Sequence, residues 1–237
     1  MKDKAQAAVL FMIGNLLIQR AIAHDLALLL HPRFRPLLLA SGALLIVLSV
    51  AVFRRREGAS AEGASWASLF ALVGVAALGM FFQPGPLGGA AAARRGLEAP
   101  PAVVAAPRAE PPRPVRTEPI RSVHEGALFL HDEEYDPRSI TGVPVDVVGF
   151  VHKNTEYGRR YFTVTRFLMV CCAADASPVG LLVGYGETPG LQEDSWVRVQ
   201  GRFVQDTVNY AYTLVVAPDV VEAAQQPADP YLYPPGR

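Results

Sequence analysis

The sequence has few cysteines, no excess of either charge and no recognisable catalytic motif. Its two cysteines, Cys171 and Cys172, are adjacent, so they cannot form a framework of disulfides between distant segments. Lysine and arginine number 22, as do aspartate and glutamate, so no basic excess favours a nucleic acid as partner. The stretch "GYGETPG" lacks the lysine of a phosphate loop and the spacing of a dinucleotide loop. Because no hydrolase or kinase motif is present either, we expect a protein that is not an enzyme.

Apolar residues are abundant and are concentrated in three runs within residues 1–83. Residues 36–53 contain no charge and are followed by three arginines, and at about 1.5 Å per residue they nearly cover a bilayer core of roughly 30 Å. Residues 64–82 also lack charge and end just before the prolines of "QPGPLGG". Both runs predict membrane-spanning helices, and the alternative for residues 64–82 is a buried helix of a soluble core.

The first apolar run, residues 5–23, contains polar side chains that include Arg20. We expect a spanning helix whose Arg20 reaches the interface, although a polar relay through Arg20 and His24 is an alternative. A cleaved signal peptide is disfavoured because two further runs follow and no small-residue cleavage site stands out. The chain is therefore predicted to be a multi-pass protein of the cell membrane, in contact with the lipid bilayer.

The basic residues that flank these runs predict the topology. Lys2, Lys4 and the arginines at 54–56 slightly outnumber the basic residues on the other side, which are Arg33, Arg35, Arg94 and Arg95. Because basic residues favour the cytoplasmic side, this small excess predicts a cytoplasmic N-terminus. Three spans would then place the C-terminal domain outside the cytoplasm.

Residues 84–122 are rich in proline, alanine and arginine, which predicts an extended linker with no core of its own. Residues 123–224 instead contain five strand-like runs separated by loop compositions, with no convincing long helix. We expect an all-β domain, a small OB-like barrel with bends at Gly149, Gly184 and Gly201, followed by a disordered tail at 225–237. An immunoglobulin-like sandwich is the alternative.

The stretch "RFLMVCCAADASPVGLLVGYG" contains a candidate metal site. Thiolates are suitable ligands for zinc or copper(I), and Cys171 and Cys172 could be joined by Asp175, with His124, His131 or His152 supplied from elsewhere in the domain. Neighbouring side chains of a regular strand point to opposite faces, so the sulfurs can converge only if the strand stops before Cys171. Alternatively, one cysteine is a core residue and Asp175 caps the turn, or the turn contacts a partner.

Four segments carry a resemblance to a known family: "LLLHPRFRPLLLASGALLIVLS", "QPGPLGGAAAARRG", "DPRSITGVPVDVVGFV" and "RFLMVCCAADASPVGLLV". With these segments the chain resembles a bacterial family of permease subunits, in which a few N-terminal helices, a variable tether and an OB-like domain accompany a larger multi-span permease. The resemblance implies a permease partner and a connection with metal supply, zinc in particular. The loop "RRREGASAEGAS" departs from the expected pattern because it contains no histidine.

These observations favour an accessory subunit of a two-component permease, whose tethered OB-like domain handles substrate or contacts the permease. A stand-alone membrane-anchored metal or thiol-redox sensor is the alternative. An enzyme that uses the cysteine pair is a third reading, for which acid–base partners are not evident.

Overall fold

A computed structural model of the chain describes residues 2–54, 70–74, 77–78, 85–97, 117–131, 140–186, 190–208 and 211–234. The chain divides into two compact units. The first consists of residues 1–85 together with Cys171–Ala173, and the second contains residues 86–170 and 174–237.

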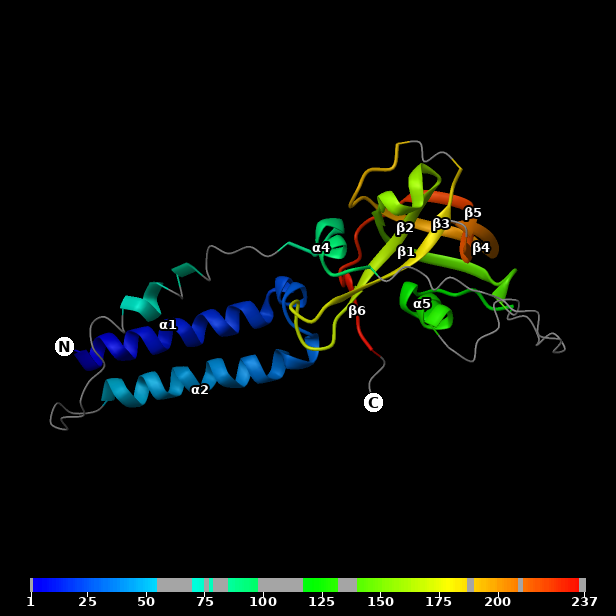
Figure 1. The fold of residues 1–237 in the computed structure, drawn as a ribbon. Helices are drawn as coiled ribbons and strands as arrows, with labels where there is room; N and C mark the ends of the chain where they lie inside the picture. The colour runs from blue at the N-terminus through cyan, green and yellow to red at the C-terminus, as the bar shows by residue number, and fades with distance from the viewer. Residues whose placement is uncertain are drawn as a thin grey trace. The chain divides into compact units, whose positions relative to one another are not determined.

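Two long helices, α1 (Lys2–Ile22) and α2 (Arg35–Arg54), form the first unit and pack side by side (Figure 1). The short 3-10 helices η1 (His24–Leu28) and η2 (Pro32–Phe34) connect them. The packing is closest at two glycines: a Cβ added to Gly42 would lie 2.8 Å from the carbonyl oxygen of Gly14, and a Cβ on Gly14 would lie 2.8 Å from that of Gly42. Small residues thus allow the two backbones to approach.

Both helices are long and apolar enough to cross a membrane, over residues 4–22 and 32–54. The structure therefore describes two such helices where the sequence predicted three. The expected third span, residues 64–82, lies mostly outside the described residues. Within it the structure describes only 70–74 and 77–78, which are helical. The predicted orientation of the helices stays a prediction.

The second unit contains a mixed sheet of six strands (Figure 1). The strands are β1 (Pro144–His152), β2 (Tyr161–Leu168), β3 (Ser177–Gly184), β4 (Trp196–Val208), β5 (Ala211–Ala223) and β6 (Tyr231–Leu232). Their order is β1-β4-β5-β3-β2-β6, and β1 also pairs with β2. The five strand-like runs in the sequence thus correspond to β1–β5, with the 3-10 helix η3 (Thr155–Arg160) between β1 and β2.

Two of the predicted glycine bends coincide with close backbone approaches. A Cβ on Gly149 would lie 2.6 Å from the carbonyl oxygen of Thr165 in β2. Gly201 lies at a register irregularity between β4 and β5, where a Cβ would overlap the carbonyl of Ala217. A side chain at either position would force neighbouring strands apart, so both sites require glycine.

The core of the second unit is made of alternating valines with a few larger side chains. Fully buried members include Val147, Phe162, Leu181, Val199, Phe203 and Val216. Burial alternates along the first half of β1 and of β4, as expected when one face of a strand is buried, whereas nearly all of β2 is buried.

Two helices lie where the sequence predicted an extended linker or part of an all-β domain. Helix α4 (Gly89–Arg94) interrupts the expected 84–122 linker, and its first N–H donates to Asp194 Oδ1. It forms because four consecutive alanines have the highest helix propensity. Helix α5 (Val123–His131) begins the predicted β domain, with Gly126 against the side chain of Leu181. Residues 98–116 of the linker lie outside the described residues.

The structure also differs from the expected disordered tail at 225–237. Within it, β6 pairs in parallel with the end of β2, and Tyr231 is buried. The buried guanidinium of Arg166 donates to the carbonyl oxygens of Asp229 and Pro230 at 2.7 and 2.9 Å. The cation also lies 5.4 Å from the ring centre of Trp196. These contacts order a segment whose own sequence contains no strand signal.

The glycine contact between α1 and α2 predicts the effect of a small substitution. Gly42→Val should lower the stability of the helix pair by roughly 1–3 kcal/mol, because a new Cβ would overlap Gly14 and Ile18. Ala43→Val is the matched control, since Ala43 is exposed. Thermal unfolding in detergent, followed by far-ultraviolet circular dichroism, measures the difference. Equal midpoints for the two variants would contradict the described packing.

The contacts of Arg166 predict a second difference in stability. Arg166→Met should lower the free energy of unfolding by roughly 2–4 kcal/mol, since it removes a buried cation that satisfies several carbonyl groups. Arg198→Met should have a smaller effect, because the ion pair that Arg198 makes with Asp146 is partly exposed to solvent. Chemical denaturation followed by tryptophan fluorescence compares the variants. A loss for Arg166→Met no larger than that for Arg198→Met would show that the C-terminal segment does not depend on this cation.

Candidate metal centre

The two cysteines lie in the turn between β2 and β3. Strand β2 ends at Leu168, three residues before Cys171. The next N–H, that of Met169, donates to the carbonyl oxygen of Leu232 in β6 at 2.8 Å. The condition set by the sequence is therefore met: Cys171 and Cys172 follow the strand and do not alternate across it.

Asp175 shapes this turn. Its Oδ1 accepts a hydrogen bond from the N–H of Val170 at 3.0 Å, five residues earlier. The hydroxyl of Ser177 donates to the carbonyl oxygen of Asp175 at 3.4 Å. This bond closes the turn, as in the alternative in which Asp175 caps it, and it also holds the carboxylate beside the cysteines.

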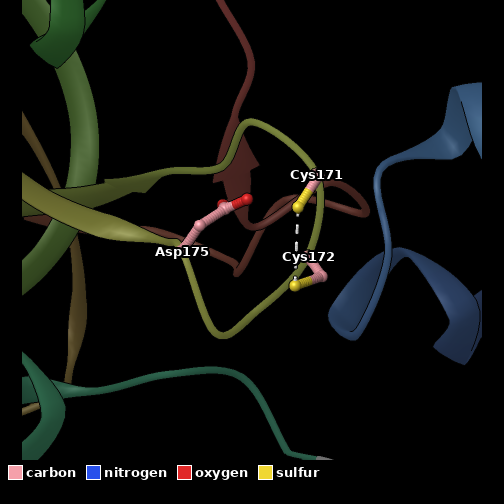
Figure 2. Close-up of side chains that lie close together, drawn as sticks. All are labelled: Cys171, Cys172 and Asp175. Carbon is pink, nitrogen blue, oxygen red and sulfur yellow. Dashed lines mark hydrogen bonds between the residues drawn. The ribbon is translucent and has the colours of Figure 1, made fainter.

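The side chains of Cys171, Cys172 and Asp175 converge, as Figure 2 shows. The two sulfurs lie 3.7 Å apart, well beyond the roughly 2.05 Å of a disulfide bond. One ligand atom from each of the three residues lies within 4.8 Å of the other two. Both cysteines are half-buried, so a small ion can reach them.

The backbone of the cysteines is also fixed. Cys171–Ala173 cluster with the first unit, where the N–H of His31 donates to the carbonyl oxygen of Cys171 at 3.0 Å. The N–H of Ala173 donates to the carbonyl oxygen of Leu29 at 2.8 Å, and Cys172 forms an antiparallel bridge with Leu30.

Among the side chains that the structure describes, the histidines that the sequence offered as further ligands do not join this group. His152, in β1, is buried, and its Nδ1 lies 2.7 Å from Glu193 Oε1. His124 lies in α5, where burial lowers its pKa and favours the neutral imidazole. The side chain of His131 lies outside the described residues. Among the described residues, the cluster therefore consists of two thiols and one carboxylate.

A cation that the sequence did not assign to the site contacts the end of the turn. The guanidinium of Arg95 donates to the carbonyl oxygen of Ala176 and lies 5.9 Å from the ring centre of Phe167. Arg95 occurs within the predicted linker, so no local signal in the sequence pointed to this contact.

The arrangement combines soft and hard donors on one short turn. Thiolates bind zinc, copper(I) and other thiophilic metals, and carboxylates are common additional zinc ligands. With two sulfurs and one carboxylate, the turn can supply three of the four ligands that zinc usually takes.

Two comparisons with known proteins gave a match. The model of the DUF1980 C-terminal domain, a family of unknown function, matches residues 128–234, which is less than half of the chain. UPF0703 protein YcgQ of Bacillus subtilis is 26% identical over 99 residues, which cover 41% of this chain and 35% of that protein. The chain thus matches about a third of the length of this distant homologue. The family match at residues 128–234 includes all six strands of the sheet.

The hydrogen bond of Asp175 predicts a graded effect of substitution. Asp175→Ala should destabilise the domain by about 1 kcal/mol, because the N–H of Val170 loses its acceptor. Asp175→Asn should cost less, since the amide oxygen can still accept this bond. Urea denaturation of both variants tests the order. The account would be contradicted if the asparagine variant were as unstable as the alanine variant.

Proposed function

We propose that this protein is an integral accessory subunit of the cell membrane that presents its C-terminal domain to a multi-span permease. The exposed apolar surface of α2 is the observation that supports a position in the membrane. Large apolar side chains such as Leu37, Leu44, Val47 and Phe53 are exposed along this helix. A helix of a soluble core buries such side chains, whereas a spanning helix exposes them to lipid.

The C-terminal domain is proposed to be an OB-like barrel. Strand pairings run from β1 to β2, β2 to β3, β3 to β5, β5 to β4 and β4 back to β1. All are antiparallel except that between β3 and β5. A five-stranded ring of this kind removes the exposed sheet edges, and OB folds use such a scaffold for binding.

The permease partner is proposed from the order of the elements. Apolar helices, a segment rich in proline and a β domain follow one another along the chain, as in the family that the sequence resembles. The domain's role would be to bind substrate or to contact the permease, not to catalyse a reaction or to bind nucleic acid. The balanced charge of the chain supports the last point.

The topology is part of the same proposal. A cytoplasmic N-terminus follows from the basic residues at positions 2, 4 and 54–56. A multi-pass chain with the expected third span would carry the C-terminal domain on the extracytoplasmic side. In that position the domain would meet substrate on the outer face of a permease.

A second candidate function is a stand-alone membrane-anchored metal or thiol-redox sensor. The observation that favours it is the convergence of Cys171, Cys172 and Asp175 in one turn. A sensor would need no permease, so the two proposals differ in whether a multi-span partner accompanies the protein.

Co-purification tests the permease proposal. The tagged full-length chain, extracted from its native membrane in a mild detergent, should bring down one multi-span protein in a fixed ratio. The same extraction from cells with the untagged chain provides the background, and a tagged chain that ends after residue 97 tests whether the β domain is required. Recovery of the chain alone, after extraction that keeps known membrane complexes intact, would contradict the permease role and favour the sensor.

A further inference from the structure

We propose that Cys171, Cys172 and Asp175 form an exchangeable binding site for one thiophilic divalent cation of the zinc class. The inference rests on the proposed function, because it names the kind of substrate that the domain would handle for a permease. It assigns both sulfurs and one carboxylate oxygen as ligands. Three observations carry it: the sulfur separation, the position of the carboxylate and the number of ligands.

The separation of the two sulfurs fits a single zinc ion. Two zinc–sulfur bonds of about 2.3 Å at a tetrahedral angle place the sulfurs about 3.8 Å apart. The sulfurs of Cys171 and Cys172 are 3.7 Å apart. The thiols therefore need almost no rearrangement of their sulfur atoms to bind one ion, and both lie beyond the end of β2, where adjacent side chains can share a side.

The carboxylate of Asp175 is held close to both sulfurs. Its hydrogen bond from the N–H of Val170 fixes one oxygen, and a carboxylate has a second oxygen that can bind a cation. In Figure 2 the carboxylate extends toward Cys171. Backbone donors that orient a ligating side chain in this way are typical of protein metal sites.

The mixture of ligands selects among metals. Copper(I) prefers sulfur donors alone, and magnesium and calcium prefer oxygen donors alone. Zinc accepts both, at about 2.3 Å from sulfur and about 2.0–2.2 Å from a carboxylate oxygen. Binding would release the thiol protons to solvent as the two thiolates form.

Three protein ligands leave a fourth coordination position for water or for a donor from another molecule. Structural zinc sites normally use four protein ligands, whereas sites with three keep an open position. Among the described residues, His124 and His152 are not part of the cluster. Together with the half-burial of both cysteines, this arrangement fits a site that accepts and passes on its ion.

The test is zinc binding by the full-length chain in detergent, kept reduced with a phosphine and first stripped with a chelator. Titration with zinc against a chromophoric chelator should give one ion per chain. Cys171→Ser and Cys172→Ser should each weaken binding by about tenfold or more, and Asp175→Asn by about tenfold. Asp219→Asn, a change of an exposed carboxylate in β5, is the control and should bind as the unmodified chain does.

Cadmium provides a second readout, since a cadmium–thiolate charge-transfer band should appear with the unmodified chain, weaken in each serine variant, which keeps one thiol, and disappear when both cysteines are replaced. Absence of zinc binding by the folded chain, or unchanged affinity in either serine variant, would overturn the inference. If a serine variant does not fold, the test relies on Asp175→Asn, whose amide oxygen can still accept the hydrogen bond from the N–H of Val170. An unchanged zinc affinity in that variant would overturn the three-ligand site. Co-purification of a permease by a chain that binds no zinc would refute this inference alone. Zinc binding without a permease would instead refute the proposed permease role.

Discussion

The buried guanidinium of Arg166 links the C-terminal segment to the sheet. It extends from β2 and donates to carbonyl oxygens of residues 229–231, while its face lies against Trp196. Burial lowers the pKa of Arg166, but an arginine remains charged in proteins, so its hydrogen bonds are charge-assisted. The cation thereby holds β6 along β2, and the N–H of Met169 donates to β6 one residue after β2 ends.

The position of that strand end decides what the following turn can do. If β2 continued through Cys172, the two thiols would lie on opposite faces of the sheet. Because it ends at Leu168, the chain turns, and the bond from Val170 to Asp175 closes the turn around the cysteines. The contacts of Arg166 with the C-terminal segment and the convergence of the two thiols are thus connected through the backbone hydrogen bonds at the end of β2.

The sequence predicted the elements with strong local patterns and missed those that depend on distant contacts. Strands β1–β5 and the apolar character of α1 and α2 follow from periodicity and composition. The run "RFLMVCC" contains no residue that stops a strand, so its end could not be located without β6. Strand β6 has two residues in a segment rich in proline, and α4 arises from alanines that also suit a linker. The contact of Gly14 with Gly42 likewise requires both helices to be in place.

We propose that the N-terminal helices anchor the chain in the membrane and that the turn after β2 carries a three-residue site for a zinc-class ion. The central claim is that both sulfurs bind the same ion. Zinc K-edge X-ray absorption of the zinc-loaded, full-length chain in detergent tests this claim most directly. The account predicts a first shell with two sulfurs at about 2.3 Å and lighter oxygen ligands at about 2.0–2.2 Å. A shell of oxygen and nitrogen alone, or of a single sulfur, would contradict it.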